Sequence, residues 1–419
     1  MERTLFLRKF TDLVRCDRPY NSLPCLLIII IGLIGALNSL MVILMEQQSF
    51  EKRVLGVKEF VTTILLISNS LERALKPHKN TRLVELIENE FLVNGIEFTR
   101  RHEKWRQFET YYNETKLEME KTSHNIFSVF VVMFFGFINR NMFNELLRDS
   151  MGLKRNSVDF PVPYVYWSPD SLNTFAFFVY IYIFQSLMIM IFAIEAYCIQ
   201  ISVSLSTERL LADFGTIYIL IDDLAKDFPE FGTTDGMNRG SHQHVDANND
   251  FRPRREMAHE SLKRDMFRIV RCHQRLIRNF KDCETNAGYV LIVISLVIFI
   301  DTCVDFYIIL KADNLMTSIN YALSSILINL AVLFPYHTGQ RIANQNDILR
   351  QSLTNLPWID KPAWFKKTLH IMMIRANVDI VMKPFGIHYL NHMSFKNMTK
   401  AAFSFGNFLY STKLKGQTQ

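Results

Sequence analysis

The sequence predicts an all-α membrane protein with seven transmembrane helices, a cytoplasmic N-terminus and an extracellular C-terminus. Apolar residues make up 49% of the 419 residues, and they are gathered into long runs rather than spread along amphipathic stripes. The runs are about 18 to 25 residues long, the length that crosses a hydrocarbon core of roughly 30 Å. Lysine and arginine are concentrated in alternate connecting segments. Together these observations exclude a soluble enzyme as the main interpretation.

Each expected span is a nearly charge-free run. In chain order the seven runs are residues 23–45, 54–71, 125–142, 173–200, 288–310, 316–336 and 393–410. Pro24 stands in the first helical turn, where its missing N–H would have no partner in any case. The second run is the weakest, because Lys58 and Glu59 lie near its start.

The positive charges predict which side of the membrane each loop faces. Residues 1–22 hold five Lys and Arg, the loop after the second span ten, the loop after the fourth thirteen and residues 341–375 six. The alternate loops hold far fewer, so the N-terminus is expected in the cytoplasm. A G-protein-coupled receptor has the reverse orientation, which excludes that class of seven-span protein.

The expected cytoplasmic segments are too long and too patterned to be simple connectors. Residues 83–121 and 255–283 carry apolar residues at three and four spacing, which predicts helices that continue the spans. Residues 231–254 are rich in Gly, Asn, Asp and His, which predicts a mobile loop. Residues 349–378 are expected to form a bent cytoplasmic helix before the final span.

The chain therefore divides into seven regions. They are a cytoplasmic N-terminus at 1–22; transmembrane helices 1 to 4 at 23–210, with a cytoplasmic helical loop at 73–122; a cytoplasmic loop at 211–287; transmembrane helices 5 and 6 at 288–340; a cytoplasmic anchor helix and linker at 341–392; helix 7 at 393–412; and an extracellular tail at 413–419.

The last span carries the most informative pattern. Its polar residues recur at three and four spacing and form one stripe, made of Ser394, Asn397, Lys400, Ser404, Asn407 and Ser411. A helix does not keep such a stripe in lipid, because each unsatisfied polar group there costs several kcal/mol. Packing against another helix is one alternative. Lys400 favours water, since a cation near mid-membrane is costly unless solvated or paired. Symmetric copies of this helix around an axis could enclose a pore.

Aromatic residues are dense in the outer halves of the third and fourth spans. A small apolar ligand needs a concave, mostly hydrophobic site with a few polar groups. The candidate ligand-binding residues are Phe134, Phe137, Phe175, Phe178 and Tyr182, with Tyr321 and Ser325 of the sixth span at similar depth. For any one aromatic residue, ordinary packing or lipid contact is the alternative.

Other chemistries are less favoured. Glu195, Asp301 and Asp305 lie in apolar runs, where ionisable groups usually have functional partners, so a secondary transporter is an alternative. The sequence contains no P-loop, HExxH or GxSxG motif, which argues against an enzyme. His242 and His244 lack carboxylate or cysteine support, so neither a metal nor a cofactor is expected. Anionic membrane lipid accounts for the basic residues, so no nucleic-acid partner is expected.

The last sixty or so residues carry a sequence-specific signature. Its parts are Trp358, Met373-Ile374-Arg375-Ala376, Lys383-Pro384-Phe385-Gly386 and Met393-Ser394-Phe395-Lys396-Asn397. These parts resemble the terminal signature of the insect odorant receptor family, whose seven spans, orientation and long cytoplasmic helices are similar to those expected here. The stretch SFGNFL at 404–409 is similar to the family's Ser-Tyr-Ser-Tyr-Phe, with Phe405 and Asn407 in place of two tyrosines.

The resemblance implies a ligand-gated, nonselective cation channel of four subunits in the plasma membrane of olfactory sensory neuron dendrites. The cytoplasmic helices would form a central anchor domain, and the last helix of each subunit would line the pore. The expected pore-lining residues are Ser404, Asn407, Tyr410, Ser411 and Lys413. The expected ligand is a small volatile apolar odorant.

The resemblance also implies a partner. The chain is shorter than the common co-receptor, Orco, and lacks its final Val-x-x-Gln pore residues, so an odorant-specific subunit of a heterotetramer with Orco is expected. Four copies of Lys413 would repel a permeant cation, which also favours a heteromer.

Some alternatives stay open. Alignment from the C-terminus places the gate at Tyr410 and Lys413, whereas alignment through Met393 and Ser394 shifts it to Ser411 and Leu414, so the gate is a zone at 408–413. A gustatory-type homotetramer that senses a polar tastant and a structural membrane scaffold are the remaining alternative functions.

Overall fold

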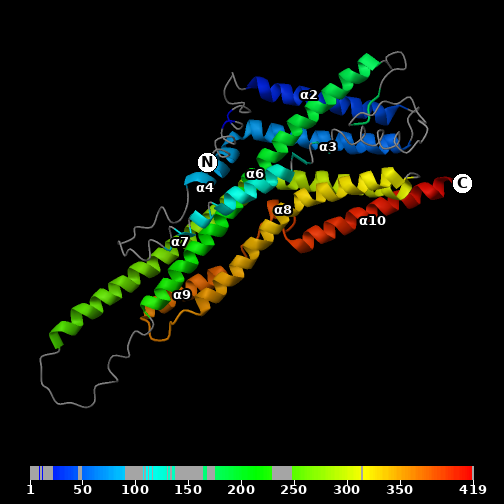
Figure 1. Ribbon diagram of the computed structural model, residues 1–419. Helices are drawn as coiled ribbons and strands as arrows, with labels where there is room; N and C mark the ends of the chain where they lie inside the picture. The colour runs from blue at the N-terminus through cyan, green and yellow to red at the C-terminus, as the bar shows by residue number, and fades with distance from the viewer. Residues whose placement is uncertain are drawn as a thin grey trace.

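The computed structural model describes residues 22–45, 50–89, 164–167, 175–228, 248–312 and 315–417, together with parts of 107–136 and residues 9 and 12. The named helices of this part are α2 (Ser22–Leu44), α3 (Phe50–Leu75), α4 (Pro77–Asn89), α6 (Phe175–Asp227), α7 (Asn248–Lys311), α8 (Leu315–Thr354), α9 (Ala363–Ala376) and α10 (His392–Gln417), with a 3₁₀ turn, η4 (Pro384–Gly386), between the last two. Figure 1 shows their arrangement.

Five helices of the described residues are long and apolar enough to cross a membrane, namely α2, α3, α6, α7 and α8. They correspond to five of the seven predicted runs. Of the third predicted run, 125–142, the structure describes residues 125–129, 131, 132, 135 and 136, which are helical. The seventh run is helical and lies in α10. It is not among the five helices apolar enough to cross a membrane, because its polar stripe lowers its hydropathy.

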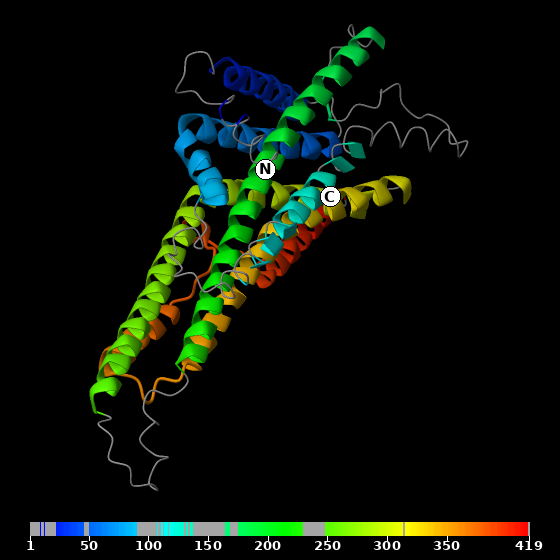
Figure 2. The same cartoon turned by 60° about the vertical axis from the view of Figure 1, so that its left-hand side comes forward.

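Three of the spanning helices are much longer than a bilayer is thick. Helices α6, α7 and α8 contain 53, 64 and 40 residues. At 1.5 Å per residue they are about 80, 95 and 60 Å long. Their far ends run together away from α2 and α3 and form a second bundle with α9, as Figures 1 and 2 show from two directions. The predicted continuation of 255–283 into the fifth span is therefore one unbroken helix.

The core of the second bundle is apolar and continuous with the membrane part. Phe214, Leu262, Leu276, Leu349 and Phe365 are fully or almost fully buried in one cluster. These residues come from α6, α7, α8 and α9, and they recur at helical spacing within each helix. The cluster continues up α7 to Ile298, so the two bundles share one core.

The segment after α8 differs from the single bent helix expected at 349–378. Helix α8 ends at Thr354 and α9 begins at Ala363, so two helices replace the bent one. Pro357 and Pro362 explain the break, because proline lacks an N–H and restricts the residue before it. Pro362 then precedes the first turn of α9, a position that proline tolerates.

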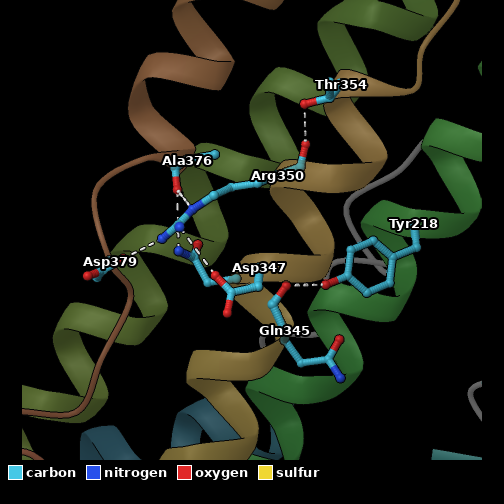
Figure 3. A network of polar contacts seen from close by, with 8 residues as sticks. Tyr218, Gln345, Asp347, Arg350, Thr354, Ala376 and Asp379 are labelled. Atoms are coloured by element: carbon cyan, nitrogen blue, oxygen red, sulfur yellow. Dashed lines mark hydrogen bonds and ion pairs between the residues drawn. The ribbon is translucent and has the colours of Figure 1, made fainter.

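Arg350 joins the two helices (Figure 3). Its Nε donates to Ala376 O, the last residue of α9, at 2.8 Å, and its guanidinium also pairs with Asp379 and Asp347. A cation at a helix C-terminus is favoured by the carbonyl groups left without helical partners. On the other side of α8, Tyr218 of α6 donates to Gln345 O at 2.6 Å. Arg350 therefore fixes α9 on α8, and Tyr218 ties α8 to α6.

Candidate functional site

Helix α10 lies against α7 through its small residues. Ala402 is 1% exposed, and a Cβ added to Gly406 would lie only 2.8 Å from Cys303 O of α7. Phe403 packs its ring edge to face with Phe306, with ring centroids 4.9 Å apart. Small residues allow this close approach of two helix backbones. One face of α10 is therefore occupied by its own chain.

The polar stripe lies on the other side of α10. Asn397, Lys400, Ser404, Asn407 and Ser411 are exposed, and Ser394 is half-buried. The Ser411 hydroxyl donates to Asn407 O within the helix, at 2.9 Å. In a membrane this side needs water or another polypeptide, because hydrocarbon cannot satisfy its amide and ammonium groups.

The remaining predicted pore residues differ in their surroundings. Tyr410 is half-buried and, like Leu409, packs against the α7 cluster of Val304, Tyr307 and Ile308. Tyr321 of α8 belongs to the same cluster. Lys413 lies in the last turns of α10, but its side chain is outside the described part of the structure.

The predicted ligand-binding residues fall into two groups. Phe178 and Tyr182 of α6 are half-buried neighbours, with ring centroids 6.0 Å apart. Tyr321 packs against the α7 cluster of Val304, Tyr307 and Ile308, and Ser325 is buried on α8 beside Asn329. Phe134, Phe137 and the side chain of Phe175 lie outside the described residues. Within the described part, Phe178 and Tyr182 therefore stand on α6, and Tyr321 and Ser325 on α8.

Residues 164–167 are held to three helices by polar side chains that sequence reasoning missed. Gln185 of α6 accepts from Tyr164 N at 2.9 Å and donates to Tyr164 O at 3.2 Å. Glu59 of α3 accepts from Val165 N at 3.0 Å, and Asn38 of α2 accepts from Trp167 N at 3.3 Å. Glu59 and Gln185 could be recognised in the sequence as polar residues inside apolar runs. Their partners, Val165 and Tyr164, could not be recognised, because each lies more than 20 residues away in the sequence.

A buried charge cluster joins α3 to α7. Lys58 Nζ lies 2.9 Å from Asp305 Oδ1 and 3.2 Å from Asp301 Oδ1. The Asp305 side chain is 0% exposed and that of Lys58 is 11% exposed. The two aspartates were singled out in the sequence, and Lys58 is the cation that accompanies them. This local pairing gives the cluster a structural role.

Glu195, the third acid singled out in the sequence, is buried and joins α6 to α3. Ser70 of α3 donates to its carboxylate, and Arg73 Nη2 lies 3.5 Å from its backbone oxygen. Glu195 and the two aspartates therefore belong to separate clusters, both of which join α3 to another helix.

A histidine in the second bundle should make stability depend on pH. His273 of α7 is 3% exposed and lines a pocket of about 290 Å³ between α7 and α9. Burial, with Arg375 nearby, lowers the pKa of His273 from 6.5 to about 4. The unfolded chain then binds the proton first as the pH falls. Stability is therefore complete above pH 6.5 and falls by up to about 3 kcal/mol as the pH drops towards 4.

Thermal unfolding of the purified protein between pH 7.5 and 4.5 should show this loss. The variant His273→Leu should lose less stability over the same range, because leucine binds no proton. An identical decline in both proteins would contradict the assignment.

The comparisons with known proteins identify the family and the fold of the chain. The family model described as 7tm Odorant receptor matches residues 57–403. The chain is similar in fold to the insect olfactory receptor OR5 from Machilis hrabei in complex with eugenol, with a TM-score of 0.67, 11% identity, and coverage of 98% of this chain and 99% of that chain. A second structure of the same receptor has a TM-score of 0.66, 12% identity and coverage of 93% and 89%. No curated protein sequence matches significantly.

Proposed function

Because the chain belongs to the odorant receptor family, we propose that it is the odorant-specific subunit of a ligand-gated, nonselective cation channel in the plasma membrane of olfactory sensory neuron dendrites. Its partner would be the co-receptor Orco, in a heterotetramer. The ligand would be a small volatile apolar odorant; the solved relative in complex with eugenol supports a ligand of that size.

The observation that carries this proposal is the two-sided character of α10. Ala402 and Gly406 pack on α7, whereas Ser404 and Asn407 on the other side are exposed. A helix with one side held by its own subunit and one polar side free is suited to line a conduit shared between subunits. The polar side would face that conduit after assembly.

The clusters suggest how a ligand could act on α10. Tyr321, the candidate ligand residue on α8, packs in the same cluster as Tyr410, the candidate gate residue. A ligand that moved Tyr321 would act on the α7 residues Val304, Tyr307 and Ile308, against which Tyr410 also packs. Opening needs a ligand that binds the open arrangement better, by roughly 5.5 kcal/mol for a shift from mostly closed to mostly open. Burial of about 220 Å² of apolar surface supplies that amount at about 25 cal/mol per Å².

Coexpression with Orco and a panel of volatile esters, terpenes and alcohols tests the proposal. We expect an odour-evoked inward current that requires both chains. Currents from this chain alone would favour the homotetrameric, gustatory-type alternative. Absence of current from every volatile class, with both chains at the cell surface, would count against an odorant-gated channel.

Cysteine accessibility tests the pore assignment in the same recordings. Ser404→Cys and Asn407→Cys should be modified by a water-soluble thiol reagent and lose most of their odour-evoked current. Ala402→Cys is the matched control, because that position is buried against α7. The five native cysteines of the described residues are also buried. Equal sensitivity of all three variants would contradict a stripe that faces water.

A further inference from the structure

Two histidine side chains face each other where α8 meets the start of α10. His337 Nδ1 and His392 Nε2 are 3.3 Å apart, and the ring centroids are 5.3 Å apart. Both side chains are exposed. The first lies just after Pro335 of α8, and the second is the first residue of α10.

The backbone around the two imidazoles is closely packed. Gly339 of α8 lies so near Leu390 that an added Cβ would overlap the Leu390 carbonyl. Tyr336 OH lies 3.2 Å from His388 Nε2, and its ring packs on Phe395 of α10. Asn391 Oδ1 accepts from Ser394 N at 2.8 Å and caps the first turn of α10. These contacts fix the backbone segments that carry His337 and His392.

The two nitrogens lie at hydrogen-bond distance, and the same separation is expected for two ligands of one metal ion. Zinc binds imidazole nitrogen at about 2.0–2.1 Å in tetrahedral geometry, which places two ligating nitrogens about 3.3 Å apart. Imidazole suits Zn²⁺ and Cu²⁺, whereas Mg²⁺ and Ca²⁺ prefer oxygen ligands. Arg341, the nearby cation, is bonded to Glu208 of α6.

We propose that His337 and His392 form a two-histidine site for a divalent transition-metal ion, Zn²⁺ or Cu²⁺, which bridges α8 and α10. In this site the Nδ1 lone pair of His337 and the Nε2 lone pair of His392 bind the ion, and the ring proton of each neutral imidazole stands on its other nitrogen. No proton is released overall, because only the tautomer changes. Water completes the coordination, since the described residues contain no group of three or more His, Cys, Asp or Glu that could hold a metal.

The site would link metal binding to the position of α10. An ion bound to both helices stabilises every state in which the imidazoles stay within reach and disfavours any state that separates them. This inference goes beyond the proposed function, and it stands even if α10 does not line a pore.

Zinc binding to the purified full-length chain in detergent tests the site. The background is the variant His242→Ala/His244→Ala, because those histidines lie outside the described residues and form a separate candidate pair. Zn²⁺ is titrated in competition with a zinc-sensitive fluorescent chelator. We expect one site in the background protein and an affinity weaker by about tenfold or more in His337→Ala or His392→Ala.

The controls separate metal binding from misfolding. His370→Ala removes an exposed histidine of α9 and should leave the affinity unchanged. His392→Cys keeps a soft ligand and should retain binding, and gel filtration checks that each variant folds.

Cu²⁺ provides a second readout. Its electron paramagnetic resonance spectrum should show two coordinated imidazole nitrogens in the background protein and one in either alanine variant. Equal affinity in the background, His337→Ala and His392→Ala proteins, or no binding in the background, would overturn the proposal. Neither readout requires a working channel.

Discussion

Replacement of Lys58 by methionine should cost about 3–5 kcal/mol of the free energy of unfolding, because it removes the cation paired with the fully buried Asp305 carboxylate. Lys58 contacts both Asp305 and Asp301, and the Asp305 side chain is fully buried. A buried charge that loses its partner keeps its desolvation penalty and loses the attraction that offset it. Thermal unfolding of the purified protein in detergent measures the change.

Two further variants show whether the cation itself is responsible. Asp301→Asn keeps the Lys58–Asp305 contact at 2.9 Å and should therefore cost much less than Lys58→Met. The triple variant Lys58→Met/Asp301→Asn/Asp305→Leu removes all three charges and should recover most of the lost stability, since apolar replacements of a buried ion pair are often neutral or stabilising. A Lys58→Met protein as stable as wild type would contradict this account.

The same cluster limits the transporter alternative. A coupling site for protons needs acids that exchange with a pathway, whereas Asp305 is sealed and paired with Lys58. The cluster also borders the contact between α7 and α10, because Cys303, between the two aspartates in sequence, lies opposite Gly406. Lys58 therefore holds α3 to the part of α7 on which α10 rests.

The helices were predictable because their signals are local. Apolar runs and three-and-four spacing depend only on neighbouring residues, so 288–310 and 255–283 were recognised in what is the single helix α7. The break at Pro357 and Pro362 was also encoded locally, but the amphipathic pattern on both sides suggested one bent helix. Composition alone could not decide between a bend and a turn of eight residues between Thr354 and Ala363.

The pairing of side chains was not predictable from the sequence. Lys58 and Asp305 are 247 residues apart, and only helix packing brings them together. The aromatic residues illustrate the same limit, because hydropathy gives the depth of a residue in a span but not the direction of its side chain. The packing of Tyr321 against Val304, Tyr307 and Ile308 of α7 was therefore not foreseen.

Substitution of Gly406 by valine should abolish most of the odour-evoked current. A Cβ at this position would lie 2.8 Å from Cys303 O, 3.0 Å from Phe306 Cβ and 3.3 Å from Tyr307 N. Two of these atoms belong to the α7 backbone and cannot rotate away, so α10 must move. Overpacking of this kind costs about 1–3 kcal/mol, more than the several tenths of a kcal/mol that valine gains over glycine in a helix.

The effect on gating depends on how the overpacking free energy of Gly406→Val is divided between the closed and the open state of the channel. If the open state brings α10 closer to α7 than the closed state does, about 2 kcal/mol placed on the open state lowers the ratio of open to closed channels about thirtyfold. Phe405→Val introduces the same residue at the neighbouring exposed position and should leave the current within a few-fold of wild type. Gly406→Ala adds only the Cβ, and its current should fall between those of the two valine variants.

The current is divided by surface expression, measured by biotinylation, so that a trafficking defect is not counted as a gating defect. A normal current per surface receptor in Gly406→Val would mean that α10 can move away from α7 without consequence, which its packing on Cys303 and Phe306 argues against.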